Sequence, residues 1–521
     1  MATLLAVEMR ALARHLSILA AQDRYARDLP RAELSLALTE VTACLSVYRT
    51  YIRGLDIPVE AKAEVGRALE EARRRRPNLS PSALDFVRQV LLLADAEHLS
   101  PAQREARLGF VMRWQQFTGP IVAKGLEDTV FYAYTPLISL NDVGGDPRPY
   151  VASRHDSPQF LQDRARSSPY TLNATTTHDT KRAEDVRARI NVLSEIPEEW
   201  ERHLRLWSRL NAPHRRTVGR HRVPDPVEET LLYQTLLGVW PLRQDEIAEF
   251  RPRLKEYVIK ATREAMVHTR WTRPNFEHEE ALTQFVESIL NVRKSRSFLT
   301  DFLKLQEKIS YYGMLNGLSQ TLLKIVSPGV PDFYQGSELW DFRLVDPDNR
   351  RAVNFGERTR LLESIAKEGV CPNPQFLHCL CQCWRDGRIK LYVVWKALNF
   401  RRQHAQLFLD GGYLSIKSHG GRAQNVFALM RYTTHQYLLA AVPRWLAHTK
   451  APMNAENTQK YWRSGFLLLP PSAPRKWFNI LTGEQLLCEN QSGRASLPLQ
   501  RLFASFPVAL VSGEIGARSP E

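Results

Sequence analysis

The sequence predicts an α/β fold that begins with a helical segment and ends with a small all-β segment. Three observations support this prediction: helical periodicity over residues 1–105, short apolar runs alternating with helical stretches over residues 106–400, and closely spaced strand-like runs over residues 401–521. Because the chain has 521 residues, we expect two or three domains.

The N-terminal segment is predicted to be a set of helices. Apolar side chains recur at steps of three and four residues, and Pro30, Pro58, Pro77 and Pro101 separate the helices. The first residues carry charged side chains inside their apolar stretch, so they predict an amphipathic helix rather than a signal peptide.

The middle segment repeats one layout three times. A short apolar run ends in polar residues and a loop in TGPIVAKGLEDTVFYAY, where the run is Ile121–Ala123, and again in YTLNATTTHDTKR and LLKIVSPGVPDFYQGSEL. Long helical stretches at 183–211, 226–266 and 278–327 separate these runs. Alternating strands and helices predict βα units in a parallel sheet, where catalytic residues gather at the strand ends.

The C-terminal segment, residues 401–521, is predicted to be a small β-sandwich-like domain. Its strand-like runs are NVFALMRYTTHQYLLAAVPRW, GFLLLPPSAPRKWFNILTGEQL and ASLPLQRLFASFPVALVSGE. Pro, Gly and Asn separate the runs at short spacing, which is typical of all-β domains.

His178 and Asp179 stand where the second apolar run ends. In a parallel α/β fold this position favours a catalytic role for Asp179. The alternative is that Asp179 or Thr180 caps the next helix, because Asp and Thr are preferred capping residues. That helix has one apolar face by its spacing, and Arg189 and Glu195 are expected to project elsewhere.

The loop after the third run is rich in residues that bind sugars. Carboxylates, amides and aromatic rings suit a polyhydroxylated ligand, since sugar hydroxyls need paired acceptors and donors and aromatic faces pack against a pyranose. Two other interpretations are a turn-rich loop that satisfies its own backbone and a calcium loop at DPDN. The candidate residues are Asp332, Tyr334, Gln335, Glu338, Asp346, Asp348 and Arg350.

Composition bears on the partners and the compartment. No apolar run of about 18 residues is present, so no membrane-spanning helix is expected.

Six cysteines do not make a disulfide framework and indicate a reducing cytoplasm. The cysteines of HCLCQCW are interpreted as buried thiols rather than a metal site. The net charge of +15 raises nucleic-acid binding as an alternative, but the run Arg73–Arg76 before Pro77 is also explained as the basic last turn of a helix. We therefore expect no nucleic acid.

Several stretches resemble one family. TTTHDTKRAEDVRARINVLSEIPEEW, AKGLEDTVFYAY, VPDPVEETLLYQTLLGVWP and PGVPDFYQGSELWDFRLVDPDNRR are similar to segments of the malto-oligosyltrehalose synthases, a branch of the α-amylase superfamily (glycoside hydrolase family thirteen). The similarity extends from VYRTYI at Val47 to KWFNILTGE at Lys476, across essentially the whole chain. Small departures include Ser46 and Asp142.

The resemblance implies the C-terminal part of a (β/α)8 TIM barrel, with residues 1–105 as a large helical insertion and residues 401–521 as the C-terminal β-domain. Family members use three catalytic carboxylates: a nucleophilic Asp in a strand resembling GxRxDH, an acid/base Glu on the next strand, and a third Asp in an HD motif after the insertion. No RxDH occurs in the 521 residues, so we expect this chain to carry the third carboxylate without the other two.

The resemblance assigns Asp179 the role of the third carboxylate, which binds sugar hydroxyls and stabilises an oxocarbenium-like transition state. It also implies a set of substrate-binding residues around the same sugar ring. These are His178, Lys181, Lys124, Glu127, Asp128, Tyr132, Asp332, Tyr334 and Gln335.

The implied activity is that of an isomerase in trehalose biosynthesis. The reducing-end α-1,4 bond of a malto-oligosaccharide becomes an α,α-1,1 bond by retaining intramolecular transglycosylation, with no cofactor or metal. Because Asp179 supplies neither nucleophile nor acid/base, we expect the chain to need a separate N-terminal half polypeptide. The alternatives are a non-catalytic α-glucan-binding remnant and a basic nucleic-acid-associated protein.

Overall fold

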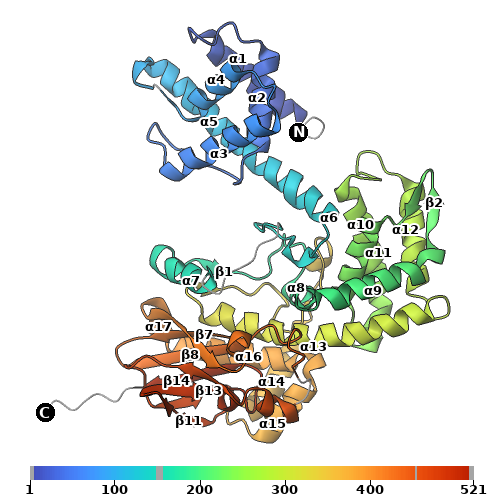
Figure 1. Cartoon of the computed structure of the whole chain (residues 1–521), viewed down its shortest axis with the longest axis vertical. Helices are drawn as coiled ribbons and strands as arrows, with labels where there is room; N and C mark the ends of the chain where they lie inside the picture. Colours follow the sequence, from blue (N-terminus) through green and yellow to red (C-terminus); the bar gives the residue numbers. More distant parts are fainter. Residues whose placement is uncertain (1–4, 95, 148–155, 452–454, 515–521) are drawn as a thin grey trace, which may run out of the picture. The chain divides into compact units, whose positions relative to one another are not determined.

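The chain forms two compact units, Met1–Tyr132 and Ala133–Glu521, which Figure 1 shows in the colours of the sequence. No helix in the described part of the chain is both long and apolar enough to cross a membrane. The computed structural model describes residues 5–94, 96–147, 156–451 and 455–514.

The first unit is a bundle of helices whose starts are set by capping residues and prolines. Ser80 caps α4 and Ser100 caps α5, each followed by Pro at the first helical position. The core is apolar and contains Trp114, whose indole nitrogen donates to Thr42 Oγ1 at 3.0 Å. The helices are α1 (Ala6–Ala21), α2 (Arg31–Ala43), α3 (Val59–Arg75), α4 (Pro81–Leu91) and α5 (Pro101–Val122), with the 3₁₀ turn η1 (Ala96–His98) before α5.

The basic run forms the end of α3. This helix ends at Arg75, and the carboxylate of Glu71 accepts from Arg74 at 2.7 Å and from Arg75 at 2.6 Å. Arg76 pairs with Glu40 on α2 at 2.5 Å. The interpretation of the run as a basic last turn is confirmed.

The strand expected at Ile121–Ala123 is wrong, because this segment is helical. Helix α5 continues into the π-helix η2 (Ala123–Val130) and the short α6 (Phe131–Ala133). A run of three apolar residues is too short to show a period, so it fits a buried turn of helix as well as a strand.

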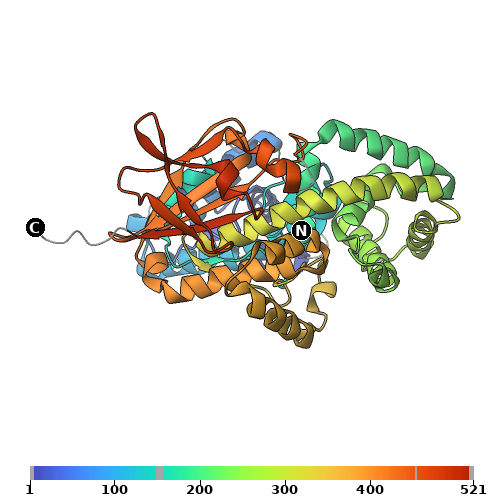
Figure 2. The same ribbon diagram turned by 90° about the horizontal axis from the view of Figure 1, so that it is seen from below.

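The helical stretches predicted within the second unit are present. Helix α13 extends from the helical part of this unit to its C-terminal sheets, as both views show (Figures 1 and 2). The 3₁₀ turn η4 (Val192–Glu195) follows α8, and the hairpin of β2 (Arg216–Val218) and β3 (His221–Val223) precedes α10. The helices are α7 (Asp156–Ser167), α8 (Glu184–Asn191), α9 (Pro197–Leu210), α10 (Pro226–Val239), α11 (Ile247–Ala265), α12 (Phe276–Ile289) and α13 (Arg296–Val326).

Helix α8 is buried on nearly every side rather than on one apolar face. Gly238 of α10 and Gly313 of α13 allow this close packing, since a Cβ at Gly313 would lie 2.5 Å from Arg189 Cγ. Arg189 itself is 2% exposed, and its guanidinium lies 3.6 Å from the ring centroid of Phe342. Glu195 is buried as well, accepting from Ala447 N at 2.9 Å. Both charged residues therefore belong to the interior.

The second and third predicted strands are present and parallel, but each has two residues. Strand β1 (Leu172–Asn173) pairs with β4 (Val330–Pro331), and beyond the last pair Asp332 N donates to Asn173 O at 3.1 Å. In the described residues this parallel sheet has two strands.

Two antiparallel sheets form the C-terminal part of the second unit, in the orders β11-β10-β14-β8-β7-β5 and β12-β13-β9-β6. Helix α13 packs on β8, where Ser319 Oγ donates to Pro443 O at 2.9 Å. The helices before the sheets are α14 (Phe355–Gly369), α15 (Pro374–Gln382), α16 (Arg388–Gln403) and α17 (Ala405–Leu409). The strands are β5 (Gly412–Ile416), β6 (Ser418–Gly420), β7 (Val426–Tyr432), β8 (Gln436–Pro443), β9 (Gly465–Leu468), β10 (Lys476–Asn479), β11 (Gln485–Leu487), β12 (Glu489–Gln491), β13 (Arg494–Pro498) and β14 (Ala509–Glu514).

The cysteines of HCLCQCW differ from the expectation of buried thiols. Cys379 and Cys383 stand four residues apart at the end of α15, and both are exposed. Cys381 fits the expectation in part, since it is half-buried and burial raises the pKa of its thiol to about 12. All six cysteines of the chain are free.

Candidate active site

His178 and Asp179 form an exposed turn between β1 and α8. Threonine side chains hold the turn: Asp179 N donates to Thr177 Oγ1 at 3.2 Å, and Thr180 Oγ1 donates to Thr177 O at 2.9 Å. Helix α8 begins after Ala183 and has no side-chain cap. The helix-cap interpretation of Asp179 and Thr180 is therefore wrong, and the Asp179 carboxylate faces solvent.

Asp332, Tyr334 and Gln335 follow β4 at the same edge of the sheet. Because β1 and β4 are parallel, their carboxyl ends lie side by side. The side chains of Asp332 and Gln335 are exposed, while Tyr334 is half-buried. The structure thus brings two of the three sequence-predicted groups of site residues to one place.

Asn349 links the two strand ends. Its side-chain amide donates to His178 O at 2.7 Å, and its backbone oxygen accepts from the Tyr334 hydroxyl at 3.3 Å. Arg343 reinforces the link, donating to Gln335 O at 2.5 Å and to Asn349 O at 3.4 Å. Sequence reasoning missed Asn349, although it belongs to the DPDN stretch, because nothing local distinguishes it from a turn former.

The carboxylates of DPDN are held by arginines rather than free for calcium. Asp348 accepts two bonds from Arg253, at 2.8 and 2.7 Å. Asp346 pairs with Arg350 at 2.8 Å. These bidentate and ionic contacts fix the loop that carries Asn349, so the geometry does not favour the calcium interpretation.

Lys181 is buried beneath the turn rather than exposed beside it. It is 2% exposed, and its backbone nitrogen donates to Asp142 Oδ1 at 3.2 Å. Asp142 Oδ2 also pairs with Arg187 Nε at 3.4 Å. The departure at Asp142 therefore has a structural role that the sequence did not reveal.

Lys124, Glu127, Asp128 and Tyr132 lie on η2 and α6, at the end of the first unit. Lys124 Nζ binds Asp128 Oδ2 at 2.6 Å, and the buried Glu127 accepts from the Tyr48 hydroxyl. A π-helix widens the turn and is frequent at functional sites. The role of these four residues in binding the same substrate as Asp179 stays a prediction.

A buried charge cluster lies directly after the turn, at the start of α8. Lys390 Nζ donates to Glu184 Oε1 and to Asp185 Oδ2, each at 2.7 Å. Lys324 Nζ donates to Glu184 Oε2 at 3.2 Å and to Thr175 Oγ1 at 2.8 Å. The four charged side chains are at most 5% exposed. Through Thr175 the cluster is tied to the segment that carries the His178–Asp179 turn.

Burial and pairing have opposite effects on the two carboxyls of this cluster. Burial alone would raise the pKa of Glu184, but Lys390 and Lys324 outweigh it and the pKa is lowered. For Asp185 burial dominates over Lys390, so its pKa is raised. One oxygen of Asp185, Oδ1, is buried without a hydrogen-bond partner. The cluster is thus a buried ion network that contacts, through Thr175, the segment carrying the exposed turn.

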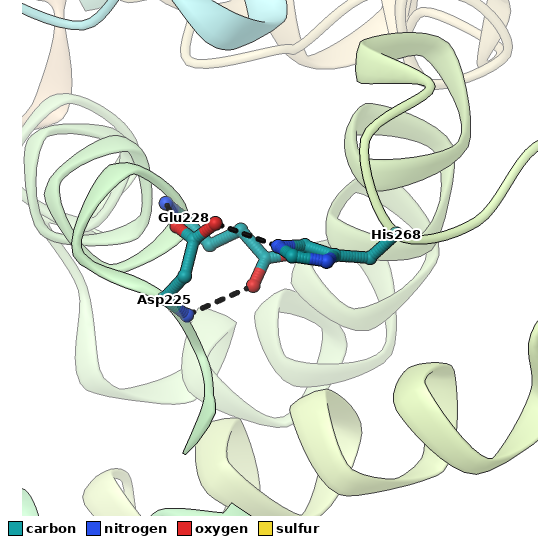
Figure 3. A group of neighbouring side chains, drawn as sticks. All are labelled: Asp225, Glu228 and His268. Carbon is teal, nitrogen blue, oxygen red and sulfur yellow. Dashed lines mark hydrogen bonds and ion pairs between the residues drawn. The ribbon is translucent and has the colours of Figure 1, made fainter. Parts of the chain in front are cut away.

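A second group of titratable side chains lies in the helical part of the same unit. Asp225 and Glu228 stand at the N-terminus of α10, and His268 follows α11 (Figure 3). One oxygen or nitrogen of each lies within 4.8 Å of the others, so among the described residues these three are suited to hold a metal ion.

A groove of about 630 Å³ lies between α7, α13 and the β7–β8 pair. Its lining includes Phe160, Asn316, Gln320 and Arg444. None of the sequence-predicted site residues lines it.

Curated proteins and solved structures that are similar to this chain carry the same family name. No family model matches the chain. A curated relative from Mycobacterium tuberculosis (strain CDC 1551 / Oshkosh), named maltooligosyl trehalose synthase, is 34% identical over 456 residues, which make up 88% of this chain and 50% of that protein. The chain therefore spans about half the length of the curated relatives it matches.

Solved structures give the same result. The maltooligosyltrehalose synthase of Arthrobacter ramosus is similar with a TM-score of 0.74 and 31% identity, covering 99% of this chain and 58% of that one. The hypothetical maltooligosyl trehalose synthase of Sulfolobus tokodaii is similar with a TM-score of 0.64 and 29% identity, covering 96% of this chain and 58% of that one.

Proposed function

The chain belongs to the maltooligosyl trehalose synthase family, of whose curated members it spans about half the length, and on that premise we propose that it is the C-terminal portion of such an enzyme. The proposed reaction converts the reducing-end α-1,4 bond of a malto-oligosaccharide into an α,α-1,1 bond by retaining intramolecular transglycosylation. In this proposal β1 and β4 are two strands of a (β/α)8 barrel. Residues 1–105 are its helical insertion, residues 106–400 hold the βα units of these two strands, and residues 401–521 are the C-terminal domain.

The joint edge of β1 and β4 is the observation that carries the proposal. Two parallel strand ends expose His178 and Asp179 on one side and Asp332 and Gln335 on the other. Carboxylates, an amide and an imidazole at one edge supply the acceptors and donors that sugar hydroxyls require, and Tyr334 offers an aromatic ring beside them.

Asp179 is proposed to stabilise the transition state, and not to serve as the nucleophile or as the acid/base. Its exposed carboxylate accepts from ring hydroxyls and stabilises the positive charge that develops at the anomeric carbon. His178 is proposed to bind the same ring. The network through Asn349 and Thr177 keeps the turn in one conformation, so little ordering is needed when the sugar binds.

Two further chemical roles are required. Retaining transfer needs a nucleophile that forms the glycosyl-enzyme and an acid/base that protonates the leaving oxygen, with carboxyls about 5 Å apart. We assign both roles to the N-terminal half of such an enzyme, which would also pair with the open edges of the β1–β4 sheet. The released glucose turns within the site. Its 1-hydroxyl gives its proton to the acid/base and attacks the anomeric carbon of the glycosyl-enzyme, which breaks the bond to the nucleophile.

The test is the incubation of maltopentaose with this chain alone and with a supplied N-terminal half of a relative. We expect trehalose-ended product from the pair and none from the solitary chain. In the pair, Asp179→Asn is expected to lower the rate about 10²–10³-fold, because one charged contact to the transition state is lost. Asp410→Asn, at an exposed position after α17, is the matched control and leaves the rate unchanged.

Three results would contradict parts of the proposal. Product from the solitary chain would remove the need for a partner. An unchanged rate for Asp179→Asn in an active pair would remove the role of Asp179. Retention of α-glucan by a pair that converts none would favour a non-catalytic glucan-binding remnant.

A further inference from the structure

Four side chains from three elements meet in the helical part of the second unit. Asp225 caps α10 and Glu228 lies in its first turn, His268 follows the end of α11, and His278 lies in the first turn of α12. His268 Nε2 lies 2.7 Å from Asp225 Oδ2, and His278 Nε2 lies 2.8 Å from Glu228 Oε1. Figure 3 shows the His268 ring directed at the two carboxylates.

Each carboxylate is oriented by the backbone through one oxygen. Asp225 Oδ1 accepts from the nitrogens of Val227 and Glu228, both at 2.8 Å, and Glu228 Oε2 accepts from Asp225 N at 3.0 Å. The other oxygen of each carboxylate lies against an imidazole, and Glu228 Oε1 also accepts from Thr262 Oγ1 at 2.7 Å. Outer hydrogen bonds of this kind orient ligating carboxylates in metal sites.

The charge of the group is not balanced by basic side chains. In the described part of the chain, the ion pairs of Asp225 and Glu228 are with histidines, and neither carboxylate pairs with a lysine or arginine. Their side chains are 24% and 13% exposed, and those of His268 and His278 are 16% and 3% exposed. The two imidazole rings stack with their centroids 4.7 Å apart, beside the two carboxylates. Imidazole and carboxylate groups are both ligands of transition-metal ions.

From this geometry we propose a binding site for a divalent transition-metal ion, with zinc as the ion that fits. The ligand atoms come from His268, Asp225 and Glu228, whose donor atoms lie within 4.8 Å of one another, and His278 Nε2 contacts Glu228 Oε1 beside them. Mixed imidazole and carboxylate ligands suit zinc, whereas magnesium and calcium prefer oxygen alone. This site goes beyond the proposed sugar chemistry and does not depend on it.

Binding requires a small local change. To bind the ion, the His268 ring presents an Nε2 that carries no proton, so that the lone pair of this nitrogen is free. The contact of 2.7 Å between His268 and Asp225 opens to roughly 3.3 Å, the spacing of two ligands about 2.0–2.1 Å from a tetrahedral zinc. The bound ion then joins the start of α10 to the segment that follows α11.

The test is a titration of the full 521-residue chain with zinc chloride in competition with a chromophoric chelator. We expect one ion per chain. Asp225→Asn and His268→Ala are each expected to lower the affinity at least about tenfold. Asn keeps the helix cap, because it accepts the same backbone hydrogen bonds as Asp, so this variant stays folded. Zinc should also raise the melting temperature of the wild type but not of the two variants.

Two control variants separate this site from its surroundings. His221→Ala removes a neighbouring ring, 5.7 Å from that of His268, which is not a proposed ligand. Cys379→Ser removes an exposed thiol. Both should bind zinc as the wild type does. The proposal is overturned if the wild type binds no stoichiometric zinc, if Asp225→Asn binds it unchanged, or if Cys379→Ser abolishes the binding.

Discussion

Two pairs of residues in one short stretch have opposite environments. His178 and Asp179 form a solvent-exposed turn, whereas Glu184 and Asp185, a few residues further on, lie inside the protein against Lys390. All four are polar and close in sequence, yet the first pair is free to meet a ligand and the second is held in a buried ion network. One short stretch therefore holds both the candidate site and the buried ion network behind it.

Breaking the buried pair should have the largest effect on the fold. Lys390→Met leaves Glu184 and Asp185 buried without their shared cation, so we expect a loss of about 3–5 kcal/mol in the free energy of unfolding, measured by urea denaturation. Lys367→Met, at an exposed position of α14, should change it by less than about 0.5 kcal/mol. Equal effects of the two variants would mean that the buried network is not the support.

Breaking the link between the two strand ends should have an intermediate effect. Asn349→Asp removes the amide that donates to His178 O, and the loss of such a hydrogen bond is expected to lower the free energy of unfolding by about 0.5–1.5 kcal/mol. The same variant should weaken malto-oligosaccharide binding, measured by calorimetry, because the turn loses its fixed conformation. Asn490→Asp is the matched control, since an Asp there still accepts from Gly493 N. A weakening caused by both variants alike would contradict the role of Asn349.

The free energy of unfolding is expected to depend on pH through the buried Glu184. The pKa of Glu184 is lowered in the folded chain, so its carboxylate stabilises the fold above the unfolded pKa near 4.5 and loses this contribution as the pH falls towards about 2. We expect the difference in unfolding free energy between the wild type and Glu184→Gln to shrink over that range in urea titrations. A difference that stays constant with pH would show that Lys390 and Lys324 do not lower this pKa.

The exposed pair should matter least for stability. Asp179→Asn changes an exposed side chain, while the hydrogen bond of Asp179 comes from its backbone nitrogen. We expect a change within about 0.5 kcal/mol in the same urea measurement. A loss comparable to that of Lys390→Met would make Asp179 a structural residue and would contradict its assignment to the sugar site.

Local pattern predicted much of the fold and the exposed part of the site. Helical spacing and capping residues located the long helices, and polar residues after apolar runs located β1 and β4. The prediction failed at Ile121–Ala123, because three apolar residues carry no period. It missed Asn349 and Asp142 because each acts on a distant residue: Asn349 bonds His178 across 171 positions, and Asp142 bonds Lys181 across 39.

The amino-acid sequence was sufficient to locate the long helices between residues 183 and 327, the ends of β1 and β4, and the family that the chain resembles. Which charged side chains are buried could be seen only in the tertiary structure. Glu184 and Asp185 have the sequence character of acidic residues in the first turn of an exposed helix, yet Lys390, 205 positions from Asp185, meets them in the interior. The physical reason is that backbone conformation depends on neighbours in the chain, whereas burial and ion pairing depend on segments that only folding brings together.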